Sequence, residues 1–496
     1  MYEQLLKTIG NLGAPRILVV GDFMLDAYVY GDAVRISPEA PVPVLKVTET
    51  QYRCGGAASV AADVAALGAT PVCIGVIGQD DHGKKLRDNL AALGADLAGL
   101  QEVPGRPTIT KQRLIGLAQH RHKQQLMRID REPAGPLSLD LGERIIQQYR
   151  EHLREADVVC LQDYNKGMLA PPLCQRMIAL AQEAGKRVLV DPALGHDYAP
   201  YSGATALTPN RREAATAVGH AIESTAEAAE AACRLRRDLT LDAAIVTLDK
   251  EGAYLVAEDI SELVPAKPRN VYDVTGAGDA VLATLAVSLA ADSDYRTAVH
   301  LANIAGGIVV EKFGTATVTV SEMVHEIAER FGGTNTKLRS LNSLLDELKG
   351  RRERGQTVVF TNGCFDVIHR GHIEYLQFCK AQGDIVVVAV NSDDSVRSLK
   401  GENRPINNQI DRATVLSGLE SVDFVTIFDE PTPTPLLEQI RPDILIKGGD
   451  WGSKKGVVGH ELVESYGGRI MLAPLVKGKS STATIEKMKA LRTEAR

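Results

Sequence analysis

Short runs of β-branched and aliphatic residues alternate along this chain with longer stretches rich in alanine and leucine, and this alternation restricts the fold more than any other feature. A strand that is apolar along its whole length is buried on both faces, as in a parallel sheet covered by helices. The alternation therefore predicts an α/β fold with parallel sheets and helices on both faces. The expected strands are 16–21, 156–161, 187–191, 243–248, 357–361 and 384–390, and the clearest expected helices are 57–67 and 172–184.

The chain has 496 residues, whereas one folding unit usually takes about 100 to 200, so we expect two or three units. Two stretches, 28–47 and 108–130, break the alternation and read as extended segments with turns, which we interpret as a small β lid over the first sheet. Residues 332–340 are polar and glycine-rich and lie between two helical patterns, so they are the best candidate linker. The expected organisation is a first unit at 1–320, a linker at 321–340 and a second unit at 341–496.

Charge and cysteine usage exclude several classes of function. The net charge of −7 argues against general binding to nucleic acid or anionic membranes. The seven cysteines have no C-x-x-C spacing, which favours reduced thiols over disulfides or a thiolate zinc site. The first residues lack the pattern of a signal peptide, and the longest apolar run, 281–291, is too short to span a bilayer and reads as a buried helix. We expect a cytoplasmic protein with no nucleic-acid or membrane partner and no metal centre built by the protein alone.

The most informative segment of the first unit is Asp-Val-Thr-Gly-Ala-Gly-Asp-Ala at 273–280, followed by an apolar helical pattern. The backbone N–H groups of Gly276, Ala277 and Gly278 would point in one direction at the helix start, where the helix dipole favours an anion. Asp279 would lie beside that anion. A carboxylate there accepts a proton from an attacking hydroxyl while the amides stabilise a phosphoryl group in transfer. The alternative is that Asp279 only stabilises the start of its helix.

With the segments that accompany it in order, this motif resembles the second signature of the ribokinase/PfkB carbohydrate kinase family, over about residues 12–320. The resemblance implies a ribokinase-like three-layer α/β/α fold with a β lid, use of ATP and Mg²⁺, and Asp279 as the general base. Ser59 stands where the family has asparagine after its di-glycine signature. Implied sugar contacts are Asp22, Asp26, Gly55, Gly56 and Ser59, and implied nucleotide contacts are Asn210, Arg211, Arg212, Glu213, Thr247, Gly252 and Asn303.

Three further groups keep two interpretations. Asp191 ends an expected strand and either binds substrate or caps the next turn. Asp163 and Lys166 belong to an Asp-Tyr-x-Lys-Gly loop at the carboxyl end of a strand, where ligands bind in open α/β sheets, or they form a charged surface turn. Lys111 and Arg113 make the lid basic, as a solvated face or as a pocket for a phosphate already carried by the sugar. The rest of this basic run is His120, Arg121, His122 and Lys123.

The second unit opens with an expected strand and then Thr-Asn-Gly-Cys-Phe-Asp-Val-Ile-His-Arg-Gly-His at 361–372. A strand that runs through an Asn-Gly turn into a helix has a geometry that binds phosphate. A metal is an alternative ligand for the two histidines, although no third ligand is near. The segment resembles the H-x-G-H signature of the cytidylyltransferase-like nucleotidyltransferases, whose fold is a Rossmann-like α/β domain with a parallel sheet, and the resemblance covers about residues 341–490. It implies catalytic roles for His369, His372 and Lys447, and nucleotide contacts at Asn362, Gly363, Phe365, Arg412, Ser480, Ser481 and Thr482.

A kinase unit followed by this transferase unit resembles the bifunctional enzymes of ADP-heptose synthesis. That resemblance implies phosphorylation of D-glycero-β-D-manno-heptose 7-phosphate at C1 by ATP, and adenylyl transfer from ATP to the heptose 1-phosphate for the lipopolysaccharide core. Two alternatives stay open. One is a different sugar kinase fused to a different transferase, such as a cytidylyltransferase, and the other is a sensing protein that binds sugar or nucleotide without turnover. Pairing of lids between subunits would give a homodimer.

Overall fold

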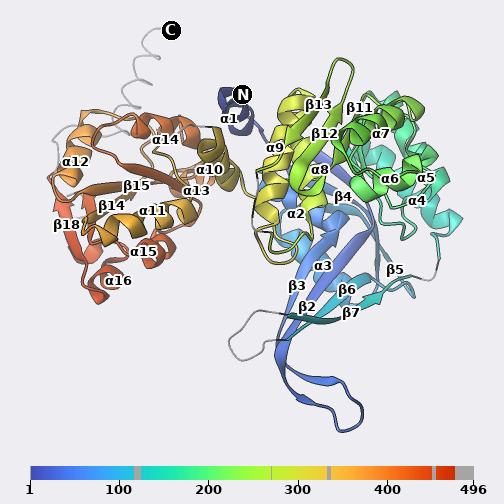
Figure 1. The fold of residues 1–496 in the computed structure, drawn as a ribbon, viewed down its shortest axis with the longest axis horizontal. Helices are drawn as coiled ribbons and strands as arrows, with labels where there is room; N and C mark the ends of the chain where they lie inside the picture. Colours follow the sequence, from blue (N-terminus) through green and yellow to red (C-terminus); the bar gives the residue numbers. More distant parts are fainter. Residues whose placement is uncertain are drawn as a thin grey trace. The chain divides into compact units, whose positions relative to one another are not determined.

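The structure is a computed structural model, and it describes residues 2–116, 124–133, 135–267, 269, 271–331, 337–448 and 454–474. The chain forms two compact units (Figure 1). Residues 11–320 make the first unit, and residues 1–10 together with 321–496 make the second. No helix in the described ranges is both long and apolar enough to pass through a bilayer.

Among the described residues, the first unit is built on a nine-stranded sheet in the order β13-β12-β11-β10-β9-β8-β1-β4-β5. The strands from β5 to β11 pair in parallel, whereas β12 and β13 form an antiparallel edge. The four strands predicted in this unit are confirmed to within two residues. The bounds are β1 (Arg16–Gly21), β4 (Thr70–Gly78), β5 (Asp96–Val103), β8 (Val158–Gln162), β9 (Arg187–Asp191), β10 (Ala206–Leu207), β11 (Ala243–Thr247), β12 (Gly252–Val256) and β13 (Ser261–Pro265).

Helices cover both faces of this sheet and give the predicted three layers (Figure 1). Leu18 and Val20 of β1 face a core that includes Ile145, Tyr149 and Met177 of the helices on one side, α4 to α7, while α2, α8 and α9 cover the other side. The predicted helices at 57–67 and 172–184 and the predicted buried helix over 281–291 are confirmed. The bounds are α2 (Ala57–Ala66), α3 (Asp81–Ala92), α4 (Leu139–Leu153), α5 (Pro171–Glu183), η1 (Ala199–Tyr201), α6 (Arg211–Val218), α7 (Thr225–Asp238), η2 (Asp249–Glu251), α8 (Ala277–Ala290) and α9 (Tyr295–Val309).

The strand order reverses between β1 and β8. After β1 the chain adds β4 and β5 on one side, and it then returns to the other side of β1 with β8. Such a reversal in an open parallel sheet leaves a crevice at the carboxyl ends of the two central strands, and ligands bind there. The residues that follow β1 and β8, which are Asp22 and 163–168, therefore border the expected ligand crevice of the first unit.

A separate four-stranded sheet in the order β3-β2-β6-β7 projects from the first unit (Figure 1). Its strands are β2 (Phe23–Ile36), β3 (Pro43–Gly56), β6 (Ile109–Gly116) and β7 (Gln124–Arg131). This sheet is the predicted lid, and Tyr28, Tyr30, Ile115 and Phe313 form an apolar cluster at it. The sequence did not indicate that β2 begins one residue after β1 ends. Asp22 is therefore the single residue between β1 of the central sheet and β2 of the lid.

The described part of the second unit contains a five-stranded parallel sheet in the order β16-β15-β14-β17-β18. The two strands predicted here are confirmed to within two residues, and the order reverses at β14, which leaves a crevice between β14 and β17. The strands are β14 (Val358–Gly363), β15 (Ile385–Asn391), β16 (Phe424–Phe428), β17 (Ile444–Gly448) and β18 (Arg469–Ala473). The helices are α1 (Tyr2–Gly10), α10 (Val320–Phe331), α11 (Leu341–Glu353), α12 (Arg370–Lys380), α13 (Asp393–Lys400), α14 (Gln409–Ser417), α15 (Thr434–Ile440), η4 (Lys454–Gly456) and α16 (His460–Ser465).

The edge strand β16 is covered by chain that precedes α11. The N–H of Val425 donates to the carbonyl oxygen of Lys337 at 2.8 Å, and the N–H of Arg339 donates to the carbonyl oxygen of Val425 at 2.9 Å. His325 of α10 adds a side-chain acceptor, because its Nε2 accepts from the N–H of Ile427 at 3.1 Å. An edge strand with unpaired backbone groups is a template for wrong pairing, so these contacts protect the sheet.

We expect His325→Ala to lower the free energy of unfolding by about 1–3 kcal/mol, because it removes the acceptor of a buried backbone N–H. Chemical denaturation of the full chain measures the loss. His220→Ala is the matched control, since His220 is exposed, and it should change stability by less than about 0.5 kcal/mol. Wild-type stability in His325→Ala would show that α10 contributes nothing to the sheet edge.

Candidate active sites

The crevice between β1 and β8 contains the predicted general base. Asp279 lies in the first turn of α8 and is 4% exposed. Its Oδ1 accepts two hydrogen bonds, from Gln162 Nε2 at 3.0 Å and from the Tyr164 hydroxyl at 3.3 Å. Gln162 is the last residue of β8 and Tyr164 follows it by two. The fold therefore carries Asp279 to the carboxyl edge of the sheet, where the last residue of β8 and a residue of the following loop hold it.

The glycine turn before α8 has the backbone geometry of an anion site. Gly276 is the N-cap with φ of 85° and ψ of −1°, a left-handed conformation that favours glycine. Asp273 fixes this turn, since its Oδ1 accepts from the N–H of Thr275 at 3.0 Å and from Thr275 Oγ1 at 2.7 Å. Its Oδ2 accepts from the N–H of Gly314 at 3.0 Å. The turn thus presents backbone amides at a helix N-terminus, the arrangement that binds phosphate.

The electrostatics of Asp279 suit a general base. Its pKa is raised to about 6, chiefly because burial disfavours the charged carboxylate. Hydrogen bonds from Ser59 and Tyr164 and the positive charge of Lys111 act in the opposite direction. A carboxylate with this pKa is ionised at pH 7 and is still basic enough to take up a proton in a transition state.

The base of the lid brings four of the predicted sugar residues together. Arg113 Nη1 donates to Asp26 Oδ1 at 2.7 Å, and both side chains are buried. A Cβ on Gly55 would lie 2.9 Å from Asp26 Oδ2, and a Cβ on Gly56, whose φ is 55°, would lie 2.5 Å from the carbonyl oxygen of Asp22. The two glycines are therefore required because a carboxylate and a carbonyl group approach the backbone closely.

A cavity of about 510 Å³ opens beside the glycine turn. Asp191 contributes to its wall and accepts from Gln162 Nε2 at 2.8 Å and from Thr208 Oγ1 at 3.2 Å. Burial, together with Glu213 and Asp279, holds the pKa of Asp191 well above its usual value. The predicted residues that line this cavity together are Asp163, Lys166, Asp191, Asn210, Glu213, Thr247, Gly276, Gly278 and Asp279.

Two of the predicted nucleotide residues also build the start of α6. Asn210 Oδ1 accepts from the N–H of Glu213 at 3.0 Å, and Glu213 Oε2 accepts from the N–H of Asn210 at 2.8 Å. This capping box fixes both side chains at the cavity wall. Arg211 instead pairs with Glu251 at 2.7 Å and so ties α6 to the loop before β12. Arg212 is exposed.

The remaining predicted nucleotide residues of the first unit lie near β12 and β13. Gly252 has φ of 110°, and a Cβ there would lie 2.1 Å from the carbonyl oxygen of Val264, so only glycine allows the two strands to approach. Asn303 Nδ2 donates to that same oxygen at 2.8 Å. Gly252 and Asn303 therefore shape the strand pair, and their contact with a nucleotide stays a prediction.

Asp22 anchors the loop 163–168 with both carboxylate oxygens. Its Oδ2 accepts from the N–H groups of Tyr164 and Lys166 at 3.0 Å each, and its Oδ1 accepts from the N–H of Met168 at 3.3 Å. The sequence indicated Asp22 as a sugar contact but did not indicate this structural role. Nor did it single out Gln162, Tyr164 or Asp273. Two features of the sequence could have indicated these residues. Gln162 lies at the end of a strand, and Tyr164 and Asp273 lie inside recognised motifs.

In the second unit, the crevice between β14 and β17 brings Asn362, Gly363 and Lys447 together. Lys447 of β17 is buried, and its Nζ donates to the carbonyl oxygen of Asn362 at 2.9 Å and also contacts the side-chain oxygen of Asn362. β14 ends at Gly363, and Phe365 then adopts φ of 47°, which turns the chain sharply. A buried ammonium group thus lies at the edge of the sheet where the strand order reverses.

His369 and His372 stack at the start of α12, with ring centroids 4.1 Å apart. The backbone N–H of His369 donates to His372 Nδ1 at 3.4 Å. Because Nδ1 accepts, the ring proton of His372 is assigned to Nε2, which can then donate. Burial, with the charges of His369 and Lys400, lowers the pKa of His372 to about 4, so this ring is a neutral donor at pH 7.

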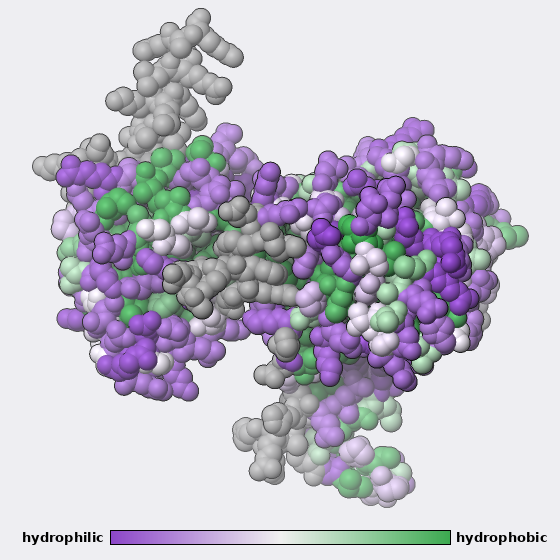
Figure 2. All heavy atoms as spheres, turned by 45° about the horizontal axis from the view of Figure 1, so that its top comes forward, coloured by the Kyte–Doolittle hydropathy of each residue, from purple (hydrophilic) through white to green (hydrophobic). Residues whose placement is uncertain are grey.

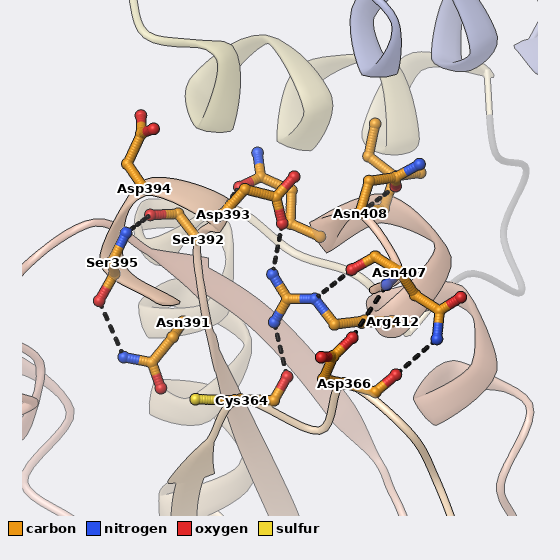
Figure 3. A network of polar contacts seen from close by, with 12 residues as sticks. Cys364, Asp366, Asn391, Ser392, Asp393, Asp394, Ser395, Asn407, Asn408 and Arg412 are labelled. Atoms are coloured by element: carbon orange, nitrogen blue, oxygen red, sulfur yellow. Dashed lines mark hydrogen bonds and ion pairs between the residues drawn. The ribbon is translucent and has the colours of Figure 1, made fainter. Parts of the chain in front are cut away.

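Arg412 lies inside a polar network and is 1% exposed (Figure 3). Its Nε donates to the carbonyl oxygen of Asn407 at 3.0 Å, its Nη1 to that of Cys364 at 2.6 Å, and its Nη2 to Asp393 Oδ1 at 2.7 Å. Arg412 therefore joins three segments around the carboxyl ends of β14 and β15. The resemblance predicted a nucleotide contact for Arg412, and it did not indicate this internal role.

Asp366 holds a second part of the same network (Figure 3). It accepts from the N–H of Ile406 at 2.7 Å, from the N–H of Asn407 at 2.9 Å and from Arg404 Nε at 2.6 Å. Burial alone would raise its pKa, but these hydrogen bonds outweigh it and hold the pKa of Asp366 below its usual value. Sequence reasoning missed this aspartate, which lies inside the H-x-G-H segment. Ser480, Ser481 and Thr482, and the lid residues His120, Arg121, His122 and Lys123, lie outside the described residues.

Comparison with protein families matches both units. Residues 14–322 match the pfkB family carbohydrate kinases and residues 360–486 match the cytidylyltransferase-like family. Among solved structures, a ribokinase of Arabidopsis thaliana complexed with ribose and ATP has a TM-score of 0.51 at 21% identity, covering 63% of this chain and 99% of that one. Phosphofructokinase-2 of Escherichia coli in complex with fructose-6-phosphate has a TM-score of 0.54 at 19% identity, covering 64% and 98%. Fold and site thus define a carbohydrate kinase joined to a nucleotidyltransferase.

Curated relatives share both units. The Bifunctional protein HldE of Geotalea uraniireducens is 44% identical over 475 residues, which is 96% of either chain. That of Alcanivorax borkumensis is 46% identical over 482 residues, 97% of this chain and 98% of the relative. The chain belongs to the pfkB carbohydrate kinase family and, along nearly its whole length, to the family of bifunctional HldE proteins. The three resemblances found in the sequence are confirmed.

We expect Gly55→Ala to lower sugar kinase turnover about a hundred-fold, because its methyl group would displace the Asp26 carboxylate from Arg113. Steady-state kinase assays measure the loss, and nucleotidyl transfer by the same preparation should be unchanged. Gly142→Ala is the control, since its Cβ would meet only Leu173 at an ordinary 3.7 Å. Full kinase activity in Gly55→Ala would mean that the position of Asp26 does not matter.

Proposed function

We propose that the chain catalyses two steps of ADP-heptose synthesis for the lipopolysaccharide core. The first is phosphorylation of D-glycero-β-D-manno-heptose 7-phosphate at C1 by ATP. The second is adenylyl transfer from ATP to heptose 1-phosphate, which releases pyrophosphate. The observation that carries the kinase half is the buried Asp279 carboxylate in the first turn of a helix that starts with the Gly276 turn. The pairing of both units in the bifunctional relatives supports the second half.

In the kinase step, the C1 hydroxyl oxygen attacks the γ-phosphorus of ATP and its proton passes to the Asp279 carboxylate. The bond between the γ-phosphorus and the oxygen that bridges to the β-phosphorus breaks, and ADP leaves. The amides of the Gly276 turn stabilise the charge that develops on the transferred group. The pKa of Asp279, raised by burial, matches this proton transfer.

ATP would enter the cavity lined by Asn210, Glu213 and Thr247. Mg²⁺ prefers oxygen ligands and is usually held by one or two carboxylates plus the phosphates of a nucleotide. Glu213 fits that requirement, because the Asn210 capping box fixes its carboxylate at the cavity wall. When bound, the ion neutralises charge on the phosphate oxygens, and the carboxylate of Glu213 would hold it there.

The phosphate already on the sugar would be recognised by the inner face of the lid. Lys111 and Arg113 are neighbours on β6 whose side chains share one face, and Arg128 on β7 is the register partner of Arg113. Arg113 is partly neutralised by Asp26, and Arg128 is partly neutralised by Asp130, so Lys111 is the strongest candidate of the three for a dianion. A basic lid of this kind favours a sugar phosphate over a neutral sugar.

In the transferase step, an oxygen of the sugar 1-phosphate attacks the α-phosphorus of ATP, and the bond from that phosphorus to the leaving pyrophosphate breaks. The attacking phosphate is already ionised near neutral pH, so no strong base is needed. The Lys447 ammonium and the Nε2–H of His372 would stabilise the pentavalent phosphorus and the departing charge. Holding the two phosphates in line is then the main task of the site.

We also propose a cytoplasmic homodimer paired through the lids. Edge strand β7 is exposed along its whole length, and Met127 and Ile129 on it are 57% and 41% exposed. Ile36 and Val47 of the β2–β3 hairpin are also exposed, and Figure 2 shows hydrophobic residues among polar ones on this projecting element. An exposed edge strand with apolar side chains favours pairing with another strand.

Incubation with Mg–ATP and D-glycero-D-manno-heptose 7-phosphate should give a new anomeric phosphate by phosphorus NMR. We expect Asp279→Asn to lower the rate by about a thousand-fold, because an amide cannot accept the proton. In the wild type, kcat/KM should fall as the pH drops below about 6, since Asp279 is then protonated. Turnover only with another sugar would refute the heptose assignment, and wild-type turnover in Asp279→Asn would refute the base.

Nucleotide competition tests the second half. With heptose 1-phosphate as acceptor, ATP should release pyrophosphate and CTP should not, and His372→Ala should lower kcat about a hundred-fold by removing one donor to the transition state. Kinase activity of that variant should equal that of the wild type, because the two sites lie in different units. Faster turnover with CTP would favour the cytidylyltransferase alternative instead.

A further inference from the structure

Two protein donors to the proposed base come from one short segment, and Ser59 of α2 is a further donor. Gln162 Nε2 and the Tyr164 hydroxyl each reach Oδ1 of Asp279, at 3.0 Å and 3.3 Å. Neither of them uses the lone pairs of Oδ2. Two bonds to one oxygen restrict the orientation of a carboxylate, and a carboxylate held in one orientation accepts a proton from a substrate hydroxyl more readily.

The backbone of Tyr164 is itself fixed. Asp22 accepts from the N–H groups of Tyr164 and Lys166, so this loop cannot shift without breaking bonds to a buried carboxylate. Gln162 is 1% exposed and its Nε2 also donates to Asp191 at 2.8 Å, which joins the base to the cavity wall. The hydroxyl of Tyr164 is therefore delivered to Asp279 from a rigid support.

The ring of Tyr164 faces the lid. Lys111 of β6 places its Nζ 4.5 Å from the ring centroid, a distance at which an ammonium group is attracted to an aromatic face. A second link ties the same loop to the end of the lid, since Lys166 Nζ pairs with Glu132 Oε2 at 2.8 Å, just after β7. Tyr164 thus contacts the lid through its ring and the base through its hydroxyl.

We propose that Tyr164 is a positioning residue that connects the lid to the general base, its ring supporting Lys111 and its hydroxyl orienting the Asp279 carboxylate toward the sugar. This inference rests on the proposed function, because it requires Asp279 to be the base. The two contacts are chemically separable. Phenylalanine keeps the ring and loses only the hydrogen bond to Asp279, whereas leucine loses both.

Steady-state kinetics on the full chain separates the two contacts. We expect Tyr164→Phe to lower kcat about ten-fold, the effect of one hydrogen bond to a charged group, with the KM values for ATP and the sugar phosphate unchanged within about two-fold. Tyr164→Leu should lower kcat similarly and also raise the KM for the sugar phosphate, because Lys111 loses its support. Tyr149→Phe is the matched control. It removes a buried hydroxyl that has no hydrogen-bond partner in the described part of the chain, and it should behave as wild type.

The outcomes are decisive in either direction. A wild-type kcat in Tyr164→Phe, or a loss that appears only in the KM for the sugar, overturns the positioning role. Equal sugar KM values in Tyr164→Phe and Tyr164→Leu overturn the link to the lid. Asp279→Asn is run alongside. If Asp279→Asn is inactive while Tyr164→Phe has wild-type activity, only the positioning role of Tyr164 is refuted. If Asp279→Asn is active, the assignment of Asp279 as the general base is refuted, and the inference about Tyr164 is refuted with it. Nucleotidyl transfer by each preparation should equal that of the wild type, because it takes place in the other unit.

Discussion

Aspartates that accept backbone N–H groups hold the loops on which both sites depend. A loop that is held in one conformation loses conformational entropy, which costs free energy. Hydrogen bonds from amides to a charged carboxylate are strong enough to offset that cost. Asp22 binds three amides of the loop after β8, Asp273 binds the glycine turn and the N–H of Gly314, and Asp366 binds two amides near the transferase crevice. These three groups therefore restrict the conformation of the loops that carry the candidate site residues.

The two sites use the same physical effect for opposite purposes. Burial disfavours charge, so it raises the pKa of an acid and lowers that of a base. In the kinase unit this brings the pKa of Asp279 to about 6, which suits a group that must take a proton from a hydroxyl. In the transferase unit it lowers the pKa of His372 to about 4 and leaves a neutral ring that can donate a hydrogen bond. The difference follows from the nucleophiles, because a hydroxyl has a proton to lose and an ionised phosphate has none.

Strand alternation and the local motifs were sufficient to predict the α/β layers, the lid, the two enzyme families and the glycine turn before Asp279. They could not reveal partners that are distant in sequence. Gln162 and Asp279 are 117 positions apart in the sequence, and no residue near either one indicates their hydrogen bond. Arg412 shows the reverse difficulty. The motif around it predicts an arginine that contacts a nucleotide. Only the packing of the folded chain shows that the guanidinium is buried against Asp393 and two carbonyl groups.

The placement of α1 has a consequence for how this chain matures. Residues 2–10 are synthesised before the whole kinase unit, yet α1 belongs to the second unit and packs on α14. During translation the kinase unit can complete its core at residue 320, while α1, with its apolar Leu5 and Ile9, must wait until Gln409–Ser417 has emerged. The second unit is therefore assembled from segments that lie on both sides of the kinase unit in the sequence.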